Sequence, residues 1–174
     1  MKNLNEVREL VKNTFQSIKK MIEVEFRDKL NFEESEIKKI VISTIKVALK
    51  FLKINEKNYY LSIYFTNNND IRKLNFKYRK KNKSTNVLSF IQDQKISLSN
   101  NKDIVMLGDI VISLEKINFE AKKLGKEFKD HLKHICVHGL LHLIGYDHNK
   151  EEDAKIMEDK EILILAKLSV PSPY

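Results

Sequence analysis

HLKHICVHGLLHLIGYDH, residues 131–148, is the stretch of this sequence that constrains the fold most strongly. Apolar residues in and around it recur at helical spacing, which predicts a helix over residues 128–144 ended by Gly145. His138 and His142 stand four residues apart, so their rings project from one face of that helix. Gly145 tolerates a positive φ and lets the chain reverse, so that His148 returns to the same place. Three histidines are therefore predicted to converge.

This convergence predicts a metal site. Two imidazoles one helical turn apart can reach the same zinc ion at Zn–N distances of roughly 2.0–2.1 Å, and His148 supplies the third ligand. The spacing H-x3-H-x2-G-x2-H is that of the metzincin zinc site. Three protein ligands leave a position for water, which is typical of a catalytic zinc. Water on zinc becomes a nucleophile near neutral pH. We therefore expect a hydrolase with one Zn²⁺ per chain.

Peptide hydrolysis is the less favoured reaction for this site. Zinc proteases with this spacing carry a glutamate directly after the first histidine as general base, and here that position is Gly139. His134 is on the same helix face and is the alternative third ligand, but it lies about 12 Å along the helix from His142, so His148 is preferred. We expect His134 to orient a neighbour or to lie on the surface.

Four other residues near the motif have predicted roles. Cys136 is expected to be a buried apolar residue, and Met157 belongs to the core stripe of the last helix. Asp147 is expected either to cap that helix or to hydrogen-bond a ligand imidazole. Asp109, at the start of a predicted strand, is expected in a turn, with support of a metal ligand as the alternative.

The remaining periodicities give the fold class. Helical spacing predicts helices over residues 3–20, 37–52, 71–78, 114–124 and 151–168. Strand patterns cover 22–26, 59–65, 86–90 and 110–112, and residues 91–105 are predicted to form a surface loop. Expected caps are Asn31 or Ser35 for the helix over 37–52 and the Asn67–Asp70 turn for the next one. The order indicates an α+β fold: a small mixed β-sheet covered by helices, with a zincin-like three-His site on a helix and its following turn. A single metal-dependent hydrolase domain over 1–174 is expected, with an N-terminal helix within 1–20.

Charge and cysteine usage limit the partners and the compartment. The net charge is +8 and the pI about 9.4, which favours an anionic partner such as nucleic acid. The chain has 28 Lys and only four Arg, and an AT-rich genome produces the same bias toward lysine whatever the function. A single cysteine excludes an intramolecular disulfide and suits a reducing compartment. No secretory h-region or membrane-spanning apolar run is present, so a cytoplasmic location is expected.

A basic segment is the second candidate functional feature. Residues 72–83 contain seven cationic side chains and no acidic one: Arg72, Lys73, Lys77, Arg79, Lys80, Lys81 and Lys83. A solvated helix face in a Lys-rich protein explains this equally well. Arg79 is more informative because arginine is scarce in this chain and its guanidinium binds phosphate oxygens in a bidentate fork. If Arg79 faces the zinc, the pair would make a phosphodiester site.

Three ordered blocks of the sequence carry a family resemblance. The first is His138-Gly-Leu-Leu-His-Leu-Ile-Gly-Tyr-Asp-His148. The second is Leu74-Asn-Phe-Lys-Tyr-Arg79 followed by Ser84-Thr-Asn-Val-Leu-Ser-Phe90, and the third is Leu107-Gly-Asp-Ile-Val-Ile-Ser113. Together they resemble the YbeY endoribonucleases of bacterial rRNA maturation, and the resemblance covers about residues 55–170. The chain departs from the family at Ser84, where proline is usual, and in its longer N-terminal helix.

The resemblance implies zinc on His138, His142 and His148 and importance of Arg79 for activity. It further implies a single-strand endoribonuclease in 16S rRNA 3′-end maturation and ribosome quality control, with small-subunit rRNA, ribosomal proteins and a ribosome-assembly GTPase as partners. Lys77, Arg79, Lys80, Lys81 and Lys83 are the candidate RNA-binding residues. The alternatives are a non-enzymatic, rRNA-binding assembly factor with structural zinc, and the metalloprotease that Gly139 disfavours.

Overall fold

The computed structural model describes residues 22–27, 32–54, 59–97 and 103–174. Their strands are β1 (Ile22–Phe26), β2 (Tyr59–Thr66), β3 (Val87–Ser97) and β4 (Asp103–Ser113), which form one sheet in the order β1-β2-β4-β3. β1, β2 and β4 are mutually parallel and β3 pairs antiparallel with β4. The predicted α+β class with a small mixed sheet is confirmed.

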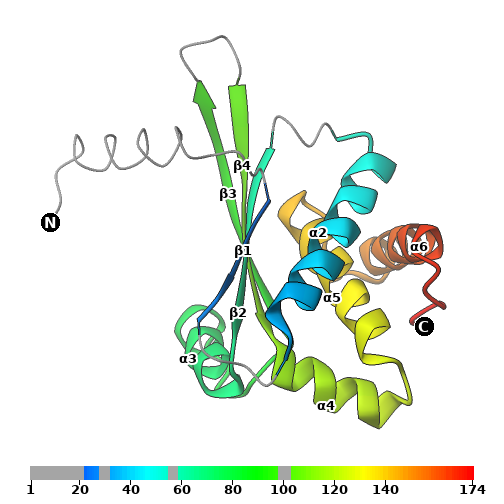
Figure 1. The fold of residues 1–174 in the computed structure, drawn as a ribbon. Coiled ribbons are helices and arrows are strands. Elements are labelled where there is room, and N and C mark those ends of the chain that lie inside the picture. Colours follow the sequence, from blue (N-terminus) through cyan, green and yellow to red (C-terminus); the bar gives the residue numbers. More distant parts are fainter. Residues whose placement is uncertain (1–21, 28–31, 55–58, 98–102) are drawn as a thin grey trace, which may run out of the picture.

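Helices cover both faces of this sheet (Figure 1). On one side lie α2 (Glu34–Phe51), α5 (Phe128–Leu143) and α6 (Glu151–Lys167), with α4 (Leu114–Leu124) leading from β4 into α5. α3 (Asn68–Arg79) lies on the other side, against β3 and β4. None of the helices in the described part of the chain is long and apolar enough to cross a membrane. The predicted helix over 3–20 falls outside the described residues.

Strand alternation divides the apolar residues between two clusters. On β4, Ile110 and Ile112 face the main core beneath α2, α5 and α6, whereas Val111 faces α3. Ile71 of α3 packs in this second, smaller cluster. α5 contributes the most continuous buried stripe, because Leu132, Ile135, Cys136, Val137, Leu140 and Leu141 are all at most 4% exposed. The helix that carries the histidines is therefore fixed along its length by the core.

The structure agrees with most of the helix caps and helix ends that the sequence predicts. The Asn67 side chain accepts a hydrogen bond from the Asp70 backbone N–H at 2.9 Å, so the predicted cap of α3 is confirmed. α4 spans the predicted 114–124 and ends at Gly125, whose φ is 64°. The predicted cap of α2 at Ser35 is wrong: the cap residue is Glu33, with no side-chain hydrogen bond, and Ser35 lies in the first turn. Asn31 is outside the described residues.

The predicted surface loop over residues 91–105 is wrong. β3 continues to Ser97 and β4 begins at Asp103, so both strands are much longer than the apolar runs indicated. Antiparallel pairing satisfies the backbone groups of each strand whatever the side chains are, which explains the extension into polar sequence. The ladder shifts register between Ile91 and Gln94, opposite Gly108. A Cβ on Gly108 would lie 2.0 Å from the Phe90 carbonyl oxygen, so this position needs glycine.

Candidate metal centre and cavity

Three histidines meet where α5 ends. His138 and His142 project from the last turns of α5, and the helix stops at its cap residue Ile144. Gly145 then takes a φ of 95°, and the Tyr146 N–H bonds back to the Leu141 carbonyl at 3.0 Å. This reversal returns His148 to the other two. One potential ligand atom from each ring lies within 4.8 Å of the others, as the spacing predicted.

Hydrogen bonds determine which ring nitrogens are free to bind a metal. His142 Nδ1 donates to the Tyr146 carbonyl at 3.0 Å, and His138 Nδ1 donates to Glu161 Oε1 at 2.9 Å. Both acceptors lack hydrogens, so the hydrogen of each neutral ring is on Nδ1 and Nε2 carries a lone pair. These two Nε2 atoms face each other at 3.1 Å. Two ligands on one tetrahedral zinc stand roughly 3.3 Å apart, so the pair fits a shared cation.

The electrostatics favour a neutral imidazole at His142. Burial lowers the pKa of His142 below its usual value, and the positive charges that His138 and His148 would carry lower the pKa further. The carbonyl of Tyr146 and the Asp147 carboxylate oppose this shift more weakly. Metal ligands must be unprotonated, so the surroundings of His142 suit an imidazole ligand.

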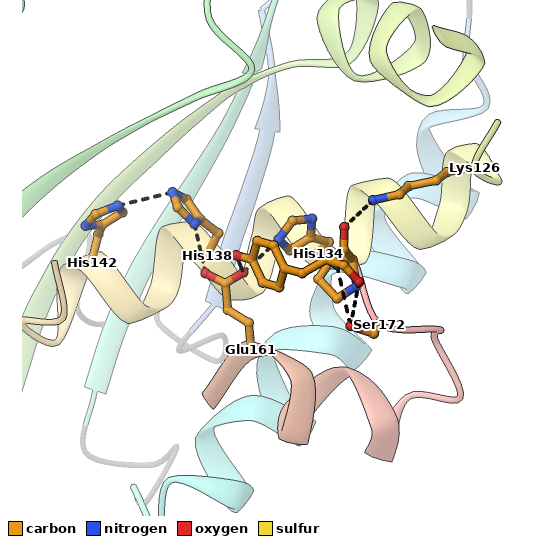
Figure 2. A network of polar contacts seen from close by, with 8 residues as sticks. Lys126, His134, His138, His142, Glu161 and Ser172 are labelled. Atoms are coloured by element: carbon orange, nitrogen blue, oxygen red, sulfur yellow. Dashed lines mark hydrogen bonds and ion pairs between the residues drawn. The ribbon is translucent and has the colours of Figure 1, made fainter. Parts of the chain in front are cut away.

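Glu161 contacts the histidine cluster and was not identified from the sequence. It lies on α6, is fully buried, and accepts hydrogen bonds from both His138 and His134 (Figure 2). Burial raises the pKa of Glu161, but the hydrogen bonds from His134 and His138 outweigh this and bring the pKa down to about 2. A signal was present: Glu161 interrupts the apolar stripe formed by Met157, Ile164 and Leu165.

The other residues near the motif divide into confirmed and wrong predictions. Met157 is buried in the core, as predicted. Asp147 does not cap α6, whose cap residue is Lys150; its carboxylate instead accepts from the His148 backbone N–H at 2.8 Å and from Asn149. Asp109 lies inside β4 rather than in a turn, and accepts from Gln92 Nε2 at 2.7 Å.

Cys136 is fully buried in the main core, as predicted. It does not line the cavity over the histidines that is described next. Burial raises the pKa of its thiol to about 12, so the thiol stays protonated at ordinary pH. We expect no reaction of the native protein with Ellman's reagent at pH 8 and one reacting thiol per chain in denaturant. Fast reaction of the native chain would contradict the buried position.

A cavity of about 710 Å³ opens over the histidines. The three histidines and the turn after α5 form one wall, and β3 together with Tyr78 and Arg79 at the end of α3 forms the rest. Arg79 therefore borders the same cavity as the three histidines, although α3 and α5 lie on opposite faces of the sheet. The arrangement places a guanidinium and a potential metal ion around one space.

The candidate RNA-binding lysines lie at different distances from this cavity. Lys81 and Lys83 border a neighbouring cavity of about 320 Å³, which shares Arg79, Thr85 and Asn86 with the first. Lys77 places its ammonium 5.1 Å from the Tyr78 ring centroid, and Lys80 donates to the Lys77 carbonyl at 3.3 Å. Neither Lys77 nor Lys80 lines either cavity. Arg79 is thus the cation shared by both.

Gly139 packs against the sheet instead of facing the cavity. Its carbonyl accepts from Ser89 Oγ at 3.0 Å, and a Cβ built on it would lie 3.0 Å from Ile110 Cγ2. A side chain after the first histidine would therefore require Ile110 to shift by a few tenths of an ångström, so the packing here disfavours a glutamate.

Comparison with known proteins decides the family. The sequence model of the family described as Endoribonuclease YbeY matches residues 6–169. The chain belongs to the YbeY family. Endoribonuclease YbeY of Bartonella quintana is 42% identical over 136 residues, covering 78% of this chain and 84% of the relative. Endoribonuclease YbeY of Agrobacterium fabrum is 42% identical over 148 residues, covering 81% and 86%.

A solved structure supports the fold independently. The solution structure of TM1509 from Thermotoga maritima aligns with a TM-score of 0.53 at 17% identity, covering 85% of this YbeY-family chain and 91% of TM1509. The likeness concerns the arrangement of helices and strands. The match to the family model and the identity with the curated relatives confirm the family resemblance that the three sequence blocks indicated.

Proposed function

We propose that this protein is a zinc-dependent single-strand endoribonuclease, formed as one domain over residues 1–174. The observation that supports it best is the cavity in which His138, His142 and His148 lie with Arg79. Relatives at about 42% identity carry the name Endoribonuclease YbeY. The family resemblance supports 16S rRNA 3′-end maturation and ribosome quality control in the cytoplasm, with ribosomal proteins and an assembly GTPase as partners.

The chain's own residues suit phosphodiester cleavage. His138, His142 and His148 would hold the zinc, which when bound supplies a Lewis acid and a water of lowered pKa. Arg79 binds the phosphate through its guanidinium fork and stabilises the negative charge that develops on it. Lys81 and Lys83, around the adjoining cavity, attract the next phosphates along the strand.

An exposed aromatic ring beside the cavity supports a single-stranded substrate. Tyr78 is 56% exposed, lines the cavity, and packs edge-on against Phe90 with ring centroids 5.0 Å apart. An aromatic ring that is more than half exposed can stack an unpaired base, which a duplex keeps inside its own stack. The binding residues would thus be Tyr78 for a base and Arg79 for a phosphate.

Replacing Tyr78 with leucine should weaken binding of a single-stranded oligoribonucleotide by about 1–3 kcal/mol, because one stacked base is lost. Tyr78→Phe should bind like the wild type, since the ring is retained. Phe76→Leu is the matched control: Phe76 lies on the same helix and is 55% exposed, but it does not line the cavity. Fluorescence anisotropy measures all four. Equal affinity of wild type and Tyr78→Leu would refute the stacking role.

The experiment that tests the proposed function is cleavage of a 3′-extended small-subunit rRNA fragment. Wild-type protein is compared before stripping with a chelator, after stripping, and after addition of Zn²⁺. Cleavage that is lost when the metal is stripped and restored when Zn²⁺ is added establishes a metal-dependent ribonuclease. Tight RNA binding without cleavage in all three samples would favour the assembly factor with structural zinc. Cleavage of casein in place of RNA would favour a protease.

A further inference from the structure

We propose that Glu161 and Tyr174 are positioning residues that hold the His138 ring in its metal-binding orientation. The inference rests on the metal site of the proposed function and adds two residues from α6 and from the segment that follows it. Neither residue faces the substrate cavity. They act through His138, whose Nδ1 donates to Glu161.

Glu161 is the centre of the network in Figure 2. Its side chain is 1% exposed and receives three hydrogen bonds. Oε1 accepts from His138 Nδ1 at 2.9 Å, while Oε2 accepts from His134 Nε2 at 2.7 Å and from the Tyr174 hydroxyl at 2.7 Å. Three donors on two oxygens fix the plane of the carboxylate, and the carboxylate in turn fixes the His138 ring.

The direction of these hydrogen bonds matters for the metal. A carboxylate accepts and does not donate, so His138 must present Nδ1–H to Glu161 and keeps its lone pair on Nε2. That Nε2 is the atom 3.1 Å from the Nε2 of His142. A glutamine at position 161 can turn its NH₂ group toward His138, which would favour the tautomer with hydrogen on Nε2 and so block the ligand atom.

Tyr174 reaches this carboxylate because the chain folds back after α6. Ser169 has a φ of 54°, and Val170, which is buried, donates its N–H to the Leu165 carbonyl at 3.0 Å. Lys126, from the loop between α4 and α5, donates to the Pro173 carbonyl at 2.6 Å. The segment is thereby anchored at both ends, which directs the Tyr174 hydroxyl inward although the residue is 61% exposed.

His134 supports the same arrangement. Its ring packs edge-on against the Tyr174 ring, with centroids 5.8 Å apart and an interplanar angle of 82°. Its Nε2 shares Glu161 Oε2 with the tyrosine hydroxyl. The residue that the sequence analysis excluded as a ligand thus lies between the segment after α6 and the metal centre. This agrees with the expectation that it orients a neighbour.

The test measures metal affinity without RNA. Wild type, Glu161→Gln and Tyr174→Phe are titrated with Zn²⁺ and Co²⁺ in competition with a chromophoric chelator, and each melting temperature is recorded. We expect Glu161→Gln to bind about 10–100-fold more weakly. Tyr174→Phe, which removes one of the three donors, should bind several-fold more weakly and change the visible spectrum of bound Co²⁺. Because Tyr174 is on the surface, its variant tests the proposal even if Glu161→Gln fails to fold.

Tyr60→Phe is the matched control, because the Tyr60 hydroxyl also donates to a glutamate, Glu23, but between β2 and β1. It should bind metal like the wild type. Wild-type affinity and an unchanged Co²⁺ spectrum in Glu161→Gln and Tyr174→Phe, with lowered melting temperatures, would overturn the proposal, since the network would then only stabilise the fold. A wild type that binds no metal would overturn the metal site itself.

Discussion

His142→Ala should lose the metal ion and all ribonuclease activity. His142 supplies the Nε2 that faces His138 at 3.1 Å, and its own Nδ1 is held by the Tyr146 carbonyl. Removal of this imidazole leaves two ligands, one of them the exposed His148. Two imidazoles do not make the three-ligand site of a catalytic zinc. The variant should therefore be indistinguishable in activity from wild-type protein stripped of metal.

Two measurements check this result. Metal content by mass spectrometry should fall from one ion per chain to none, and added Zn²⁺ should restore the stripped wild type but not the variant. The fold should persist, because His142 is partly exposed whereas its helix is held by buried neighbours such as Leu140 and Leu141. Circular dichroism provides that control. A variant that retains both metal and cleavage would exclude His142 as a ligand.

Arg79→Ala should lower the rate of cleavage by about 10²–10³-fold while leaving the metal in place. The expected size is that of removing one donor which stabilises charge in a transition state. Arg79 borders the cavity but belongs to α3, which has no residue in the histidine cluster. Its loss should therefore act on kcat and not on metal affinity. Arg79→Lys should recover only part of the rate, because an ammonium group lacks the bidentate fork.

Arg72→Ala is the matched control for this effect. Arg72 is exposed on the same helix, donates to Asn69 at 3.3 Å, and does not border either cavity. Its substitution removes the same charge and should change cleavage little at moderate salt. Undiminished cleavage by Arg79→Ala would refute the proposed role. An equal loss in both variants would show that net charge, rather than position, governs the reaction.

The histidine cluster could be predicted from the sequence because all its parts are local. Helical spacing places His138 and His142 on one face, and Gly145 carries the reversal for His148, so one stretch of the chain contains the whole cluster. The same locality explains the correct end of α4 at Gly125. Contacts between residues far apart in the sequence could not be predicted from such local spacing. Glu161 is 23 residues from His138, and only the packing of α6 on α5 brings them together.

The hairpin of β3 and β4 escaped prediction for a different reason. Side-chain pattern detects strands that bury one face, and the polar sequence after Ile91 gives no such pattern. The two strands nevertheless pair through their backbones as far as Ser97 and Asp103. The nearness of Arg79 to the histidines likewise depends on strand order, because β3 lies at the sheet edge and borders the cavity.

The packing of Gly139 limits how this scaffold can be redesigned. A glutamate grafted after the first histidine, the simplest route toward a peptidase, would press its Cβ into Ile110 and disturb the hydrogen bond from Ser89. A carboxylate could instead be introduced on β3 at Ile91, which borders the cavity and takes no part in the contact with Gly139. The close contact between α5 and β4 thus restricts which side chains can follow the first histidine.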